Sequence, residues 1–237
     1  MLMKHLSTFK MTFKEQEVYE VLEEWDFESN KESLGATYFQ IFYETFYTTL
    51  WDEFTEEEVA GGWENFTHKD GFKAPNEFLT YKMIMDSVEH PFLKNEQYPE
   101  IETMEDLVKI AFSKAVEKID ALDKDNTEWG KYKNTLIEHL AMIPAFSKNI
   151  NTGGNYKVVN ATGKYHGPSW RMILDFADGN VKGLGIYPGG QSGNPGSPYY
   201  DNFVESWMEG NYHELFNSNK VEDFENEKFE KVTFKVN

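Results

Sequence analysis

Cysteine is absent from the 237 residues of the chain, so disulfide bonds and thiol catalysis are excluded. Long apolar runs are absent too: none approaches the roughly 20 residues of a membrane-spanning helix, and residues 1–10 lack the apolar core of a signal peptide. Basic residues are scarce, because 23 lysines and arginines stand against 41 aspartates and glutamates, giving a net charge of −18. That charge disfavours nucleic acid and anionic membrane surfaces as partners, since both are bound through clustered cations.

Arginine is nearly absent as well: Arg171 is the only one, and the other 22 basic residues are lysine. A guanidinium offers a rigid fork of donors that suits a carboxylate or a set of carbonyls inside a fold. Because Arg171 follows Trp170 in an apolar, strand-like run, we expect a buried side chain with a fixed partner. Asp175, four residues further along, points to the same face of the strand. The pattern favours an ion pair of these two residues or a bond from Arg171 to loop carbonyls; contact with a substrate is the less favoured alternative.

The hydrophobic pattern predicts a mainly helical region followed by a β-rich region, which we expect to form one compact unit. Residues 1–143 are mainly helical, with apolar side chains at helical spacing over 15–27, 31–54 and 76–89 and from a capping box at Thr103 onward. Residues 144–237 are β-rich, with strand-like runs at 156–161, 169–176, 181–187 and 231–236 and one helix over 198–209. Aromatic residues make up 16% of the chain, which suits a packed globular protein.

Common cofactor and metal patterns are not matched. Pro188 stands where a dinucleotide-binding loop needs its third glycine, and the six histidines lie far apart without metal-ligand spacing. The acidic cluster at 120–126 lacks the glycine and glutamate of a calcium loop. We therefore expect no cofactor and no metal. Ser192 and Ser197 lack the GxSxG elbow of a serine nucleophile, and we expect them to brace their loop by bonding the main chain.

Several motifs follow one another between Gly167 and Tyr212: GPSxR with an acidic residue four positions later, PGGQSGNPxSxxYD, and WxxGxY. Upstream stand WGKYK (129–133), IEHL (137–140), a Gly-Gly pair (153–154), VNA (159–161) and, more weakly, LEEWD (22–26). This set resembles the C-terminal portion of the penicillin amidase (penicillin acylase) family of N-terminal nucleophile hydrolases. The positions that match the family motifs, and to which we assign a structural role, are Ser169, Arg171, Asp175, Gly189, Gly190, Gln191, Ser192, Gly193, Asn194, Ser197, Tyr200 and Asp201.

The resemblance implies an α+β fold, in which helices cover strands that join a four-layer αββα core. It also implies that the parent enzyme hydrolyses linear amides through a nucleophile freed at a chain N-terminus, whose own α-amino group acts as the base. Met1 to Lys4 offer no such nucleophile, and the oxyanion-hole residues of the family lie upstream of the matched part. The resemblance therefore assigns no catalytic residue to this chain, which we expect to be a fragment that is inactive alone. A periplasmic or exported location is implied for the parent family.

The implied partner is the remainder of the acylase polypeptide, the upstream part that bears the nucleophile. Self-association of the fragment through open sheet edges is a further expectation. Two alternatives stay open. The chain is a non-catalytic binding module that reuses this fold segment, or it is a complete hydrolase with an unrecognised site. The second alternative is the weakest, because no set of nucleophile, base and orienting residue can be assembled from the sequence.

Overall fold

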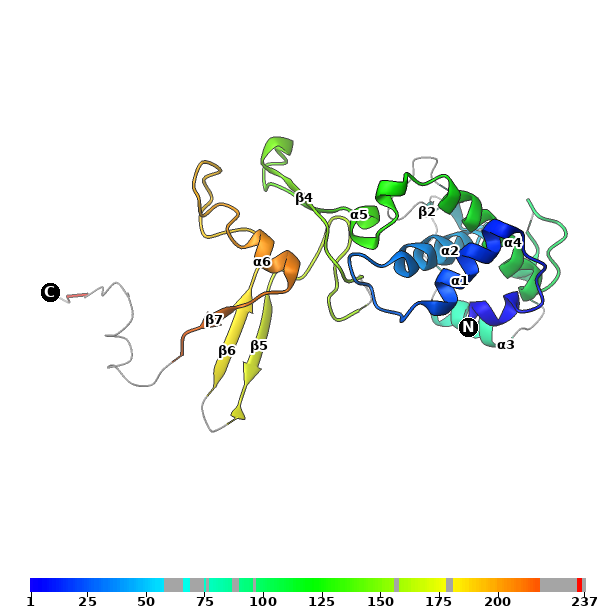
Figure 1. Ribbon diagram of the computed structural model, residues 1–237, viewed down its shortest axis with the longest axis horizontal. Coiled ribbons are helices and arrows are strands. Elements are labelled where there is room, and N and C mark those ends of the chain that lie inside the picture. Colours follow the sequence, from blue (N-terminus) through cyan, green and yellow to red (C-terminus); the bar gives the residue numbers. More distant parts are fainter. Residues whose placement is uncertain are drawn as a thin grey trace. The chain divides into compact units, whose positions relative to one another are not determined.

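The computed structural model describes residues 1–57, 66–68, 75, 77–86, 90–95, 97–155, 158–177, 181–217 and 234–235. Contacts within the chain group it into two units, which we call the N-terminal unit (Met1–Gly167) and the C-terminal unit (Pro168–Asn237). Elements of both units are labelled in Figure 1 where there is room. Helices occur with small antiparallel sheets, so the predicted α+β class is confirmed.

Three helices form the body of the N-terminal unit: α1 (Phe13–Glu24), α2 (Leu34–Leu50) and α4 (Met104–Asp120). α2 packs along α4, and there the rings of Phe42 and Phe112 meet edge to face with their centroids 5.2 Å apart. The short 3-10 helix η1 (Leu2–Leu6) closes the same apolar core. This core follows from the sequence, because aromatic and aliphatic side chains recur at helical spacing along α2 and α4.

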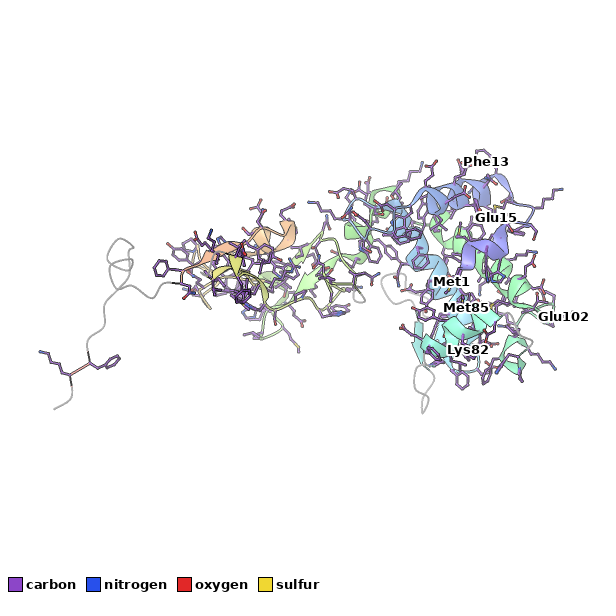
Figure 2. All side chains as sticks on the ribbon, turned by 90° about the horizontal axis from the view of Figure 1, so that it is seen from below. Met1, Phe13, Glu15, Lys82, Met85 and Glu102 are labelled. Carbon is purple, nitrogen blue, oxygen red and sulfur yellow. The ribbon has the colours of Figure 1, made fainter. Side chains whose placement is uncertain are left out.

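Capping boxes fix where α1 and α4 begin. Thr12 accepts a hydrogen bond from the Glu15 backbone, while the Glu15 carboxylate accepts one from the Thr12 backbone; Thr103 and Asp106 repeat the arrangement at α4. Figure 2 marks Glu15 in the first turn of α1. Glu15 also accepts a 2.5 Å hydrogen bond from Ser113 on α4, which ties the two helices together. Burial raises the pKa of Glu15, but the bonds from Ser113 and Thr12 outweigh it and hold the pKa below its usual range.

The remaining elements of the N-terminal unit are short. They are α3 (Glu77–Asp86), α5 (Trp129–Lys133), the 3-10 helices η2 (Pro91–Leu93), η3 (Lys124–Asn126) and η4 (Pro144–Phe146), and the strands β1 (Thr55–Glu57), β2 (Phe66–His68), β3 (Thr135–Ile137) and β4 (Lys148–Ile150). β1 pairs with β2 and β3 with β4, both antiparallel. None of the helices among the described residues is long and apolar enough to cross a bilayer.

The C-terminal unit holds a three-stranded antiparallel sheet with the order β5 (Arg171–Asp175), β6 (Lys182–Ile186) and β7 (His213–Leu215). Arg171 lies opposite Ile186 and Asp175 opposite Lys182, while Gly185 lies opposite His213 of β7. α6 (Val204–Glu209) lies at the end of the hairpin where β5 begins and β6 ends (Figure 1).

Most predicted elements are present, with shorter bounds. The helix predicted over 198–209 narrows to α6, because residues 197–203 form successive turns instead. Residues 158–161 form no strand, since the backbone there makes turns in which Val158 donates to the Asn155 carbonyl and Thr162 to the Asn160 carbonyl. Residues 156–157 lie outside the described residues. The strand predicted over 231–236 also lies outside them, apart from 234–235. The boundary between the two units lies after Gly167, later than the predicted change from helical to β-rich sequence after residue 143. That the whole chain forms a single compact body stays a prediction.

Candidate functional site

In the N-terminal unit, the Gly153–Gly154 pair and Thr162, which follows the VNA motif, meet at Lys133. This residue ends α5 in the WGKYK motif, and its side chain is fully buried. The ammonium donates hydrogen bonds to the carbonyl oxygens of Gly153 (2.9 Å) and Gly154 (2.9 Å) and to Thr162 Oγ1 (2.7 Å). An ammonium has three protons, so these neutral acceptors match its donors. We call the cluster of Trp129, Lys133, Gly153, Gly154 and Thr162 the lysine hub.

The other members of the lysine hub fix the path of the backbone around the ammonium. Trp129 is fully buried, donates from Nε1 to the Gly154 carbonyl (2.7 Å) and places its ring 5.6 Å from the ammonium. Thr162 donates to the Gly153 carbonyl (2.6 Å). Gly154 has a φ of 85°, and a Cβ there would lie 2.2 Å from the Asn160 carbonyl oxygen, so only glycine fits. The hub holds α5, the Gly153–Gly154 pair and Thr162 together.

Arg171 organises the C-terminal unit. Its Nη1 donates to the Trp207 carbonyl oxygen (2.6 Å), and its guanidinium stacks on the Trp207 ring at 4.3 Å. Trp207 is itself buried and donates from Nε1 to the Pro168 carbonyl (3.0 Å). The same Trp207 carbonyl accepts from Gly210, which ends α6 at a φ of 74°. Arg171 therefore places a positive charge at the C-terminal end of α6, where the helix dipole favours it.

The structure distinguishes between the two contacts that the sequence favours for Arg171, an ion pair with Asp175 and a bond to loop carbonyls. Its bond runs to a carbonyl, though of a helix and not of a loop. Asp175 is exposed at the other end of β5 and accepts from the backbone of Ala177 (2.8 Å). The pairing of Arg171 with Asp175 is wrong for a geometric reason, because four residues of strand span roughly 13 Å. Arg171 is also half-buried and not buried; burial lowers its pKa, while nearby Tyr212 acts in the opposite direction.

The loop between β6 and α6 holds nine of the predicted site residues, Gly189, Gly190, Gln191, Ser192, Gly193, Asn194, Ser197, Tyr200 and Asp201. It closes where the Phe203 backbone donates to the Gly189 carbonyl (2.9 Å) and the Ser192 backbone donates to the Tyr199 carbonyl (3.0 Å). Gly190 allows this closure, since a Cβ there would lie 2.2 Å from the Tyr199 carbonyl oxygen.

The side chains of this loop bond its own main chain. Ser192 Oγ accepts from Asn194, Asn194 Oδ1 from Gly196, and Ser197 Oγ from Tyr199. The two serines therefore brace the loop, as the sequence predicts for residues of this type. Ser169, the remaining motif position, is exposed just before β5.

Sequence reasoning missed the organising roles of Lys133 and Trp207. Both stand in quoted motifs, but neither motif says which of its side chains turns inward. No group of three or more histidine, aspartate or glutamate side chains within the described ranges is arranged to hold a metal ion.

The comparisons with known proteins agree with the motifs. The family model "Penicillin amidase" matches residues 1–223. An acyl-homoserine lactone acylase QuiP from Pseudomonas syringae pathovar tomato is 30% identical over 141 residues, covering 52% of this chain and 17% of its own length. One from Pseudomonas fluorescens is 22% identical over 214 residues, covering 84% of this chain and 25% of its own length. This chain thus spans a quarter or less of these relatives.

A solved structure shares the fold. The thermostable penicillin G acylase from Alcaligenes faecalis superposes on the whole of this chain and on 45% of its own, with a TM-score of 0.52 and 10% identity. At that identity the likeness shows the fold alone. The segments joined by the lysine hub and by Arg171 and Trp207 all lie inside the family match, which extends over nearly the whole sequence. The chain belongs to the penicillin amidase family.

Proposed function

We propose that the chain is the C-terminal portion of an enzyme that hydrolyses linear amides, and that it serves as scaffold. The upstream part of the parent supplies the nucleophile at a chain N-terminus. That nucleophile attacks the amide carbonyl, the amine leaves with a proton, and water then cleaves the acyl-enzyme and releases the acid. The chain alone performs none of these steps.

One observation carries the scaffold role. The polar side chains of the matched motifs that have a described partner mostly bond main-chain atoms: Lys133 bonds two carbonyls, and Arg171 bonds one. Ser192 and Ser197, the loop hydroxyls, accept from backbone amides. A hydroxyl whose oxygen accepts from the backbone two residues along the chain braces its loop. The small share of the relatives' length that the chain covers supports an upstream catalytic part.

The test compares this chain with the longest polypeptide of its source that contains it, identified by mass spectrometry. Both are assayed on phenylacetyl amide, acyl-homoserine lactone and β-lactam amide reporters. We expect turnover by the longer polypeptide and none by the 237-residue chain. Turnover by the chain that survives repurification and is lost on Ser192→Ala or Ser197→Ala would overturn the proposal. An inactive longer polypeptide would favour the non-catalytic binding module.

A further inference from the structure

Aromatic side chains form an exposed row on the N-terminal unit, where α1 ends and α2 begins. Trp25 follows the last residue of α1, and the centroid of its ring lies 5.4 Å from that of Phe27 and 5.3 Å from that of Phe39. Phe39 in turn stacks on Tyr43 at 6.0 Å. Phe27 is 81% exposed and Phe39 38%. We call these four residues the aromatic row. Single exposed apolar side chains are ordinary, whereas a contiguous group of them marks an interaction surface.

The aromatic row has a rigid support. Trp25 Nε1 donates to the Glu28 carbonyl (2.9 Å), and the ring rests on Gly35, where a Cβ would lie 2.3 Å from Trp25 Cγ. The connection between α1 and α2 is also tied to the lysine hub, because the Ser29 carbonyl accepts from the Gly154 backbone (2.7 Å). The rings are therefore held in place before a partner arrives, which lowers the entropy cost of binding one.

Phe27 holds its exposed ring on a strained backbone. Its φ of 65° lies in the left-handed region, which bulky side chains rarely adopt and which glycine or asparagine would occupy with less strain. Core packing does not account for a phenylalanine here, since the ring is exposed.

Carboxylates flank the first two rings of the row. Residues 23–28 read EEWDFE, so each ring has a carboxylate on both sides along the chain, where consecutive Cα atoms lie about 3.8 Å apart. The carboxylates are all exposed: Glu23, Glu24, Asp26 and Glu28. Within the described ranges none of the four takes part in an ion pair, and the nearest lysine in sequence, Lys31, lies beside Glu32 instead. This surface is aromatic and negatively charged at once.

The face of an aromatic ring and a carboxylate both attract cations. An arginine side chain suits the two together, because its flat guanidinium stacks on rings and its fork of donors pairs with carboxylates. The chain itself contains such a stack, in which the Arg171 guanidinium lies 4.3 Å from the centre of the Trp207 ring.

We propose that the aromatic row and the carboxylates of residues 23–28 bind an arginine-bearing basic segment of a partner protein. The net charge of −18 attracts such a segment from a distance. An uncharged apolar partner fits less well, because it would bury carboxylates without a counter-charge. A second copy of the chain carries the same net charge, and its one arginine is already stacked on Trp207. This inference goes beyond the proposed function and does not depend on it.

The binding test uses a short peptide in which three arginines alternate with glycines, blocked at both ends and labelled with an uncharged dye. The matched peptide has citrulline in place of arginine, which keeps the flat shape and removes the charge. Fluorescence anisotropy gives the dissociation constants for the 237-residue chain and for the longer polypeptide that contains it. We expect both proteins to bind the arginine peptide about tenfold or more tightly than the citrulline peptide. Free argininamide, the probe for a small organic cation, should bind about tenfold or more weakly than the arginine peptide.

Phe27→Asn tests the aromatic row. Asparagine removes the ring and suits the left-handed backbone, so the variant should keep its melting temperature. We expect it to bind the arginine peptide about fivefold more weakly. Phe13→Asn is the control, because it removes another phenylalanine of similar exposure, 79%, and should leave the affinity unchanged.

A double variant, Glu24→Gln with Asp26→Asn, tests the carboxylates. The asparagine keeps the oxygen that accepts from the Glu28 backbone, so the turn is preserved. We expect about tenfold weaker binding of the arginine peptide. Glu100→Gln with Glu102→Gln removes two exposed charges just before α4 and gives the same net charge, so it should change the affinity little.

Each outcome supports the proposal or overturns it. Equal binding of the arginine and citrulline peptides, or binding of neither, overturns recognition of a cation. Equal losses in the two double variants assign the attraction to the overall charge and overturn the site. Argininamide that binds as tightly as the peptide assigns the surface to a small organic cation instead of a protein partner. Binding by the isolated chain but not by the longer polypeptide shows that the parent covers the row, which also overturns the proposal. Amide turnover is measured separately, so none of these results decides the proposed function.

Discussion

Replacement of Lys133 by methionine tests whether the lysine hub holds the N-terminal unit together. Methionine keeps the length of the stem and removes the ammonium, so the three hydrogen bonds to Gly153, Gly154 and Thr162 are lost. Bonds from a charged donor contribute about 1.5–3 kcal/mol each, or roughly 4.5–9 kcal/mol together. Relief from burying a charge offsets several kcal/mol of this.

Two of the three acceptors keep another hydrogen bond, and this reduces the loss of stability further. The Gly154 carbonyl keeps its bond from Trp129, and the Gly153 carbonyl keeps its bond from Thr162. We therefore expect Lys133→Met to lower the free energy of unfolding by about 3 kcal/mol. In urea, this shifts the midpoint by about 1 M. Tryptophan fluorescence follows the transition, since Trp129 is a member of the hub.

Lys131→Met is the matched control on the same helix. The Lys131 ammonium lies 2.9 Å from the Glu128 carboxylate, and both side chains are about two-fifths exposed. An exposed pair of this kind contributes little to stability because water screens it, so the control should move the midpoint little. Thr162→Val combined with Lys133→Met should cost less than the sum of the two single changes, because both remove the same bond. Equal midpoints for Lys133→Met and Lys131→Met would refute the hub as a source of stability.

Three further changes probe other contacts. Arg171→Lys keeps the charge but loses the planar fork and its stack on Trp207, and we expect a loss of about 2 kcal/mol by urea denaturation; a midpoint unchanged from the parent would contradict that. The pKa of Glu15 is held low in the folded state, so its contribution to stability is present above the unfolded pKa and is lost as the pH falls through the lower, folded pKa. Ser113→Ala should flatten that pH dependence, measured by melting temperature. Phe27 has a φ of 65°; Phe27→Val should cost about 1 kcal/mol more than Phe27→Asn, since asparagine tolerates left-handed backbone.

Long periodic helices could be predicted from the sequence because their pattern repeats over several turns. α1, α2 and α4 are all present, and the capping box at Thr103 begins α4 as predicted. α2 starts three residues later than predicted, at Leu34, since Ser33 caps it by accepting from the Ala36 backbone. The pairs β1–β2 and β3–β4 were not predicted. Their strands have three residues each, which is too few for an alternating pattern to show.

The roles of the candidate site residues could be predicted from the sequence less well than the helices. Lys131 and Lys133 stand two positions apart in one motif, yet the first is exposed and the second fully buried. The sequence alone cannot distinguish them, because the difference comes from acceptors 20 to 29 residues downstream, the carbonyls of Gly153 and Gly154 and the hydroxyl of Thr162. The same holds for Arg171: its rarity marked it as an organising residue, but its partner Trp207 lies 36 residues away and bonds through main chain, which leaves no sequence signature.

The two units differ in how far their own residues can stabilise them. The N-terminal unit has a closed core in which Phe46, Leu107 and Phe112 are fully buried. Among the described residues of the C-terminal unit, the buried large hydrophobic side chains are Ile186 and Trp207. A three-stranded sheet with so small a core is marginal in water, since apolar burial is the main source of stability. Contacts that cover its exposed strand residues Met172, Ile173 and Leu174 would therefore supply stability that the C-terminal unit does not generate itself. Substitutions in its sheet should consequently change the stability of the longer polypeptide more than that of the isolated chain.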